Sequence, residues 1–263
     1  MSRNALSKPH SIVRVLLFLI ACAVVLAFAA PIAQRFAARD FELFLGVVTS
    51  IATFALTAIF VRWERLSLAD AGAEPNGGSL ARLVLGFLIG SVIIAAWAVI
   101  SLAAGQVHWV RAHDFDPGSI AVALLAYLSL ACREELAFRG YPLRMLDRRF
   151  GLWPAQLSIA FMFALEHKLA GATWVDAFLG SGVGSLLFGM AAIATRGLAI
   201  PIGIHAAWNL GHWALGLKGT PGVWRVIERP HSTGVEGIFV YDAVMLFAVF
   251  AFWVWHRRSA KRT

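Results

Sequence analysis

Charged residues are scarce in this sequence, and their scarcity excludes an ordinary soluble protein. Of the 263 residues, only 14% are Asp, Glu, Lys or Arg, whereas 59% are hydrophobic. A soluble domain carries about a quarter charged residues and about half apolar ones. No soluble protein of this size has enough interior to bury that much apolar surface. Lipid must therefore surround much of the chain.

Cysteine is scarce in this sequence, and two known protease motifs are absent from it. Cys22 and Cys132 both lie inside apolar stretches, where thiols behave as small hydrophobes, so we expect no disulfide. A site-2-type metalloprotease needs His-Glu-x-x-His on one helix, and the sequence has no such run. A rhomboid-type serine protease needs Gly-x-Ser-Gly, but Leu179 replaces the first glycine before Ser181. Ser181 with His205 as its base stays an alternative.

Acidic residues are fewer than basic ones, 15 against 23, which gives a formal net charge of +8. A nucleic-acid-binding protein gathers its basic residues on one face or in one run. Here they form short clusters between apolar stretches, as in membrane proteins with positively charged cytoplasmic loops. We therefore expect the lipid bilayer, and no nucleic acid, as a partner.

Eight apolar stretches are long enough, or nearly so, to cross a membrane as helices. The sequence therefore predicts an all-α, polytopic transmembrane bundle of about eight spans within a single membrane domain, residues 1–263. The run 15–30 resembles a signal peptide, but its length and the proline that follows it favour a retained first helix. The predicted spans are Ile12–Gln34, Leu43–Val61, Ala81–Ala104, Gly118–Ala137, Leu152–His167, Ala177–Thr195, Leu198–Leu217 and Gly237–His256.

The distribution of Lys and Arg predicts the topology. About fourteen lie in the two tails and the loops on the side of the termini, against about seven in the opposite loops. This excess places both termini in the cytoplasm. We expect a multi-pass protein of the bacterial inner membrane.

Polar residues interrupt three spans. The fourth ends with Arg133, Glu134, Glu135 and Arg139. Glu135 and Arg139 are four residues apart and can pair along one helix face. Glu134 points about 100° away from Glu135, so it is free to face the bundle.

The fifth span carries Phe163 and His167 on one face, and the seventh carries His205, Asn209 and His212 as one polar stripe. Ionisable residues inside a membrane are costly and mark functional sites. A glutamate in a low-dielectric bundle suits a general base. Imidazole and amide groups can bind a metal or stabilise an oxyanion. Together these groups are typical of peptide hydrolysis without a serine or cysteine nucleophile.

Three motifs, in order and on separate spans, resemble a known family. Glu134-Glu135-xxx-Arg139, Phe163-xxx-His167 and His205-xxx-Asn209 are similar to those of the CAAX prenyl endopeptidase and bacteriocin-processing family of intramembrane proteases. The resemblance covers the core 118–215. It implies a membrane-associated or small peptide as substrate and a site reached from the cytoplasm.

The resemblance also implies a role for each matching residue. Glu134 would activate the attacking water, and His167 would hold that water or a metal. His205 and Asn209 would stabilise the oxyanion or bind metal, with Glu135 and Arg139 in support. A zinc site built from His167, His205 and Glu134 and a metal-free mechanism both stay open. His212 lies outside the family pattern.

The depth of His167 is a difficulty. Glu134 is expected near the cytoplasmic face, whereas His167 lies roughly 20 Å or more beyond Leu152 at 1.5 Å per residue. Either the fifth helix begins late, after a surface segment, or it tilts strongly.

Other functions stay open on the sequence. A haem protein would have His167 and His205 facing each other across apolar space. A proton-coupled transporter would use Glu134 with Arg133 as its partner, although we find no inverted repeats. A catalytically inactive scaffold or immunity protein would retain the fold alone.

Overall fold

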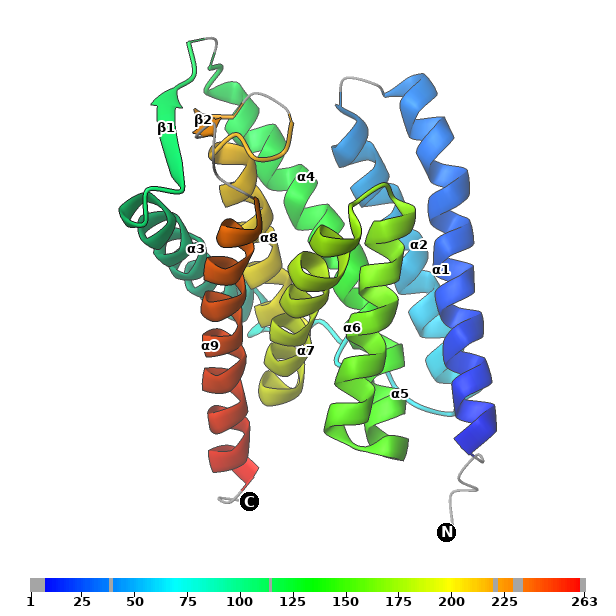
Figure 1. Ribbon diagram of the computed structural model, residues 1–263. Coiled ribbons are helices and arrows are strands. Elements are labelled where there is room, and N and C mark those ends of the chain that lie inside the picture. Colours follow the sequence, from blue (N-terminus) through cyan, green and yellow to red (C-terminus); the bar gives the residue numbers. More distant parts are fainter. Residues whose placement is uncertain (1–7, 38–39, 114, 220–221, 229–233, 261–263) are drawn as a thin grey trace.

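The protein is a bundle of long helices. The computed structural model describes residues 8–37, 40–113, 115–219, 222–228 and 234–260. Figure 1 shows the helices packed side by side, with two short strands at one end of the bundle. Among the described residues, five helices are long and apolar enough to cross a membrane. The chain is an integral, multi-pass membrane protein, as its hydropathy predicts.

The long apolar helices follow the predicted spans closely. They are α1 (Lys8–Phe36), α2 (Phe41–Trp63), α3 (Ser79–Ala103), the continuous run of η3 (Asp176–Gly182) and α7 (Val183–Thr195), and α9 (Gly234–Ala260).

The other three predicted spans form α4 (Gly118–Glu135), α6 (Leu152–Leu169) and α8 (Ala199–Ala214). These helices are shorter or carry the polar residues of interest, so they are not among the apolar spans. The count of eight spans therefore stays a prediction.

Both described ends of the chain lie at the same end of the bundle, at the bottom of Figure 1. An even number of crossings would give this arrangement. The side of the membrane stays a prediction. Five of the basic residues counted for it, Arg3, Arg39, Arg229, Lys261 and Arg262, lie outside the described residues.

Three features were not predicted. The short helix α5 (Tyr141–Phe150) precedes α6, and a π-helical turn, η2 (Leu136–Gly140), joins α4 to α5. The strands β1 (Val107–Arg111) and β2 (Trp224–Glu228) pair antiparallel, so the described part of the chain is all-α apart from one two-stranded sheet. Those strands are far apart in the sequence, and local periodicity carries no signal for such a pairing.

Glycines bring α3 and α8 into backbone contact. A Cβ atom on Gly86 would collide with the backbone of Ile200, and one on Gly203 with the backbone of Leu83. Small residues at helix contacts allow this close approach in membrane proteins. The contact fixes α8, which carries the third motif, against the bundle.

Candidate functional site

The first motif lies where α4 changes its helical pitch. Glu134 and Glu135 are the last residues of α4, and the wider π-helical turn η2 contains Arg139. Turns of this kind are frequent at functional sites. The structure corrects the expected position of Glu134. Its helix continues through η2 into α5 instead of ending near Ala137, so Glu134 lies in the interior of the bundle rather than near its end.

Glu135 is the buried centre of a three-helix network. Its Oε1 lies 2.8 Å from His205 Nδ1 on α8 and 3.4 Å from Arg139 Nη1. The side chains of Glu135 and Arg139 are fully buried. Arg139 also donates to the hydroxyl of Ser185 on α7 at 2.8 Å. The predicted pairing of Glu135 with Arg139 is present, with His205 as an additional partner.

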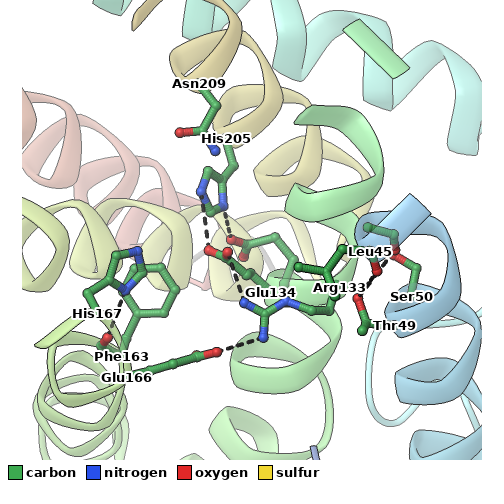
Figure 2. Close-up of polar contacts among 12 residues, drawn as sticks. Leu45, Thr49, Ser50, Arg133, Glu134, Phe163, Glu166, His167, His205 and Asn209 are labelled. Atoms are coloured by element: carbon green, nitrogen blue, oxygen red, sulfur yellow. Dashed lines mark hydrogen bonds and ion pairs between the residues drawn. The ribbon is translucent and has the colours of Figure 1, made fainter. Parts of the chain in front are cut away.

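The His205 ring is held on two sides. Phe188 stacks on it at 4.2 Å between centroids and 11° between planes. Because Nδ1 faces the Glu135 carboxylate, Nδ1 is the nitrogen that donates. The other nitrogen, Nε2, lies 3.5 Å from Glu134 Oε2. Figure 2 shows the two groups facing each other across the gap between α4 and α8.

Glu134 is oriented by a second network. Arg133 Nη2 donates to Glu134 Oε1 at 3.0 Å, and Arg133 Nη1 donates to Glu166 Oε1 at 2.7 Å. Glu134 Oε2 is buried and accepts no hydrogen bond from any described residue. An unsatisfied buried carboxylate oxygen beside an imidazole nitrogen is a place where a water molecule or a substrate group can bind.

The ion pair between Arg133 and Glu166 removes the difficulty over the depth of the site. Glu134 precedes Gly151 by 17 residues, and His167 follows Gly151 by 16 residues. The chain reverses at Gly151, between α5 and α6. The two motifs therefore lie at similar heights. The late start proposed for the fifth helix is wrong, because α6 begins at Leu152.

His167 faces the same site from α6. Its Nδ1 lies 3.0 Å from the Phe163 carbonyl oxygen, and its ring packs on the Phe163 ring at 4.4 Å. The carbonyl can only accept, so Nδ1 donates and Nε2 is left to accept. In Figure 2 His167 and His205 approach Glu134 from two different directions, from α6 and α8 respectively. Among the described residues, no hydrogen bond joins His167 to Glu134.

Asn209 completes the polar face of α8 one turn beyond His205. Lys218 Nζ donates to Asn209 Oδ1 at 3.0 Å. An ammonium group can only donate, so this contact assigns the amide orientation and leaves Nδ2 free to donate. Figure 2 shows the Asn209 nitrogen on the side of the His205 ring.

The remaining candidates lie outside this cluster. His212 packs between Trp97 and Trp208, with ring centroids 5.4 and 4.6 Å away. Ser181 makes no hydrogen bond to His205 in the described part of the chain, so its pairing with that base is not observed. The haem hypothesis needs His167 and His205 to face each other across open apolar space, but the Phe163 ring packs against both, with centroids 4.4 and 6.3 Å away.

The residues do not fit a three-ligand zinc centre. Within the ranges that the structure describes, no three His, Cys, Asp or Glu side chains are grouped to hold a metal ion. His205 and His167 each hold Nδ1 in a hydrogen bond within the protein, so only Nε2 of each ring could bind a metal. A catalytic zinc site needs three protein ligands. The mechanism considered below therefore uses no metal.

Sequence reasoning missed three functional contacts. They are the contacts of Glu166 with Arg133, of Ser185 with Arg139 and of Lys218 with Asn209. Their partners come from other helices, and nothing in a linear pattern reveals them. For Glu166 a signal did exist, because a carboxylate inside an apolar helix needs a cationic partner from elsewhere in the bundle.

Comparison with models of protein families gives a match over the middle of the chain. Residues 116–211 match the model of a protein family described as type II CAAX prenyl endopeptidase Rce1-like. The matched region covers just over a third of the chain and contains the three motifs. It confirms the family resemblance. A search of curated proteins returned no match.

Proposed function

We propose that this chain, which belongs over residues 116–211 to the Rce1-like family of type II CAAX prenyl endopeptidases, hydrolyses peptide bonds at the membrane. The observation that carries the proposal is the pair formed by Glu134 and His205. Glu134 Oε2 is buried beside His205 Nε2 at 3.5 Å and lacks a donor among the described residues. A carboxylate placed in this way can accept a proton from water.

In the proposed reaction, Glu134 and His205 act on the same water molecule. The neutral His205 ring, with its proton on Nδ1, presents Nε2 as an acceptor for one water hydrogen. Glu134 accepts the other hydrogen as a proton while the water oxygen attacks the scissile carbonyl carbon. Glu134 then returns the proton to the leaving amine nitrogen as the C–N bond breaks. The products are an amine and a carboxylic acid, which keeps the second water hydrogen until it ionises in water, and no covalent intermediate with the protein forms.

Asn209 is the proposed donor to the oxyanion. Its Nδ2 is free because Lys218 occupies Oδ1. A preorganised donor of this kind contributes most where charge develops in the transition state. This refines the role expected for His205, since a neutral ring with Nδ1 as its donor cannot also donate from Nε2. His167, which presents an accepting Nε2, is the proposed second support for the water.

Proton-coupled transport is the second candidate, because one observation favours it. That hypothesis predicted Arg133 as the partner of Glu134, and the two side chains are 3.0 Å apart. The same contact also suits hydrolysis, since it fixes the carboxylate. The match to a peptidase family favours the hydrolytic function.

The test is cleavage of a fluorogenic membrane-peptide library by the purified protein in detergent or liposomes. Wild type is compared with Glu134→Gln, which keeps the shape of the side chain, and with Ser181→Ala. We expect cleavage by wild type and Ser181→Ala, both unaffected by a chelator, and none by Glu134→Gln. Equal cleavage by Glu134→Gln would remove Glu134 from its role. Loss of cleavage in Ser181→Ala would establish the serine mechanism instead.

The substrate and the membrane are part of the same proposal. The resemblance implies a membrane-associated or small peptide, and the bacterial inner membrane is the proposed location. Proton uptake into liposomes that depends on Glu134, without any peptide cleavage, would support transport and contradict the peptidase.

A further inference from the structure

Arg133 connects the helices that carry the first two motifs. Its guanidinium donates to Glu134 on α4 at 3.0 Å and to Glu166 on α6 at 2.7 Å. The side chains are largely buried, with exposures of 8% for Arg133, 13% for Glu134 and 22% for Glu166. A guanidinium holds its nitrogens in one rigid plane. The place of Glu166 therefore sets the direction from which Arg133 meets Glu134.

The surroundings leave Arg133 few other partners. Arg133 and Glu166 line a recess of about 160 Å³ whose other walls are apolar and include Leu19, Cys22 and Phe138. An unpaired charge in such a place is costly. Within the described residues, the hydrogen bonds of the Arg133 side chain go to the two glutamates. The arrangement of the three charges is therefore strongly constrained.

Arg133 holds one carboxylate oxygen of Glu134 and leaves the other available. Arg133 binds Oε1, whereas Oε2 lies beside His205 Nε2. A carboxylate without Arg133 could rotate and pair differently, because His205 would be its remaining charged or polar neighbour in this network. A misplacement of a reacting group by about 1 Å can cost about 100-fold in rate.

We propose that Arg133 and Glu166 are positioning residues for the hydrolysis. Glu166 anchors Arg133, Arg133 holds Oε1 of Glu134, and Oε2 is thereby directed toward the attacking water. The inference rests on the proposed function of Glu134. Neither residue belongs to the three motifs that carry the family resemblance, and neither is assigned contact with the substrate.

If Glu166 acts on Glu134 only through Arg133, the variants should show a specific kinetic pattern. Arg133→Met should lower kcat about 100-fold with little change in KM, because the base is misplaced and the substrate contacts are intact. Glu166→Leu should lower kcat about tenfold, since Arg133 keeps one partner. The double variant should match Arg133→Met alone, because Glu166 acts only through Arg133. Arg133→Lys should retain part of the activity by pairing with Glu134.

The experiment measures kcat and KM for these four variants, wild type and Glu134→Gln on one peptide that wild type cleaves. Thermal unfolding in the same detergent excludes variants that fail to fold. The matched control is Arg148→Met, which breaks the exposed ion pair of 2.8 Å with Asp70 and should change kcat less than about twofold.

The outcomes separate the two levels of the proposal. Glutamate-dependent cleavage that is unchanged in folded Arg133→Met overturns the positioning role and leaves the proposed function intact. Additive losses in the double variant, or losses in KM alone, also overturn it. Absence of any Glu134-dependent cleavage by wild type removes the proposed function, and the positioning role falls with it.

Discussion

His205 Nδ1 lies 2.8 Å from Glu135 Oε1, and the same oxygen is 3.4 Å from the guanidinium of Arg139. One buried oxygen therefore connects the end of α4, the π-helical turn and α8. Arg139 is further surrounded by Phe163 and Phe188, whose ring centroids lie 4.4 and 5.4 Å from its central carbon. This cluster holds the Nδ1 side of His205, whereas Glu134 lies on its Nε2 side, where the reaction is proposed to take place.

Removal of the Glu135 carboxylate should destabilise the fold. Glu135→Leu leaves the fully buried Arg139 without its acidic partner, and breaking a buried pair costs about 3–5 kcal/mol. Glu135→Gln keeps an acceptor for His205 and should cost less. Thermal or denaturant unfolding in detergent measures both. Equal stability of Glu135→Leu and wild type would show that the network carries little of the folding energy.

Asn209 and Lys218 should affect the rate unequally. Asn209→Leu removes the proposed oxyanion donor and should lower kcat about 10²–10³-fold, with a smaller effect on KM. Lys218→Met removes only the contact that orients the amide, so a smaller loss is expected. Steady-state kinetics on a cleaved peptide distinguish the two. A larger loss for Lys218→Met than for Asn209→Leu would contradict this order.

The contact between α3 and α8 should tolerate no added methyl group. Gly203→Ala places a Cβ against the backbone of Leu83. Overpacking of this kind costs about 1–3 kcal/mol and should displace α8 together with His205. Gly180→Ala is the matched control, since no atom lies within 4 Å of its new Cβ. Unfolding and activity assays should show a defect in the first variant only.

Asp70 should give the fold a small acid-sensitive contribution. The backbone N–H and hydroxyl of Ser67, followed by Arg148, bind the carboxylate and lower the pKa of Asp70 to about 2. A lowered pKa stabilises the fold above the unfolded value of about 4, and this contribution is lost as the pH falls toward about 2. Because the pair is partly exposed, it is worth less than about 1 kcal/mol.

The measurement for Asp70 compares wild type with Asp70→Asn at several pH values. The stability difference between the two proteins should be constant at neutral pH and should shrink between about pH 4 and pH 2. The difference removes the contribution of other carboxylates that titrate in the same range. A difference that grows on acidification would show that Asp70 is not stabilised as its anion.

The sequence was informative where a signal is local. Apolar length located the helices within a few residues, and the four-residue spacing of Glu135 and Arg139 predicted their pairing. It failed where the signal depends on three-dimensional contacts. The pitch change in η2 carries Glu134 away from the helix end, and no pattern of apolar residues distinguishes that turn from an ordinary helix end.

The partners of the site residues were also beyond the sequence. Glu166 and Lys218 reach Arg133 and Asn209 from other parts of the chain, and a single sequence carries no record of such pairs. The assignment of the donating nitrogen of His205 follows from a contact between its Nδ1 and Glu135, which only the packing of α8 on α4 creates.

The ion pair between α4 and α6 has a consequence for biogenesis. The helix α4 brings Arg133 and Glu134 together as a locally compensated pair, whereas α6 brings Glu166, whose cationic partner is on α4. Insertion of α6 into lipid is therefore least costly once α4 is already there to receive it. Synthesis from the N-terminus supplies α4 before α6. The cationic Arg133 is therefore already in place when Glu166 enters the membrane.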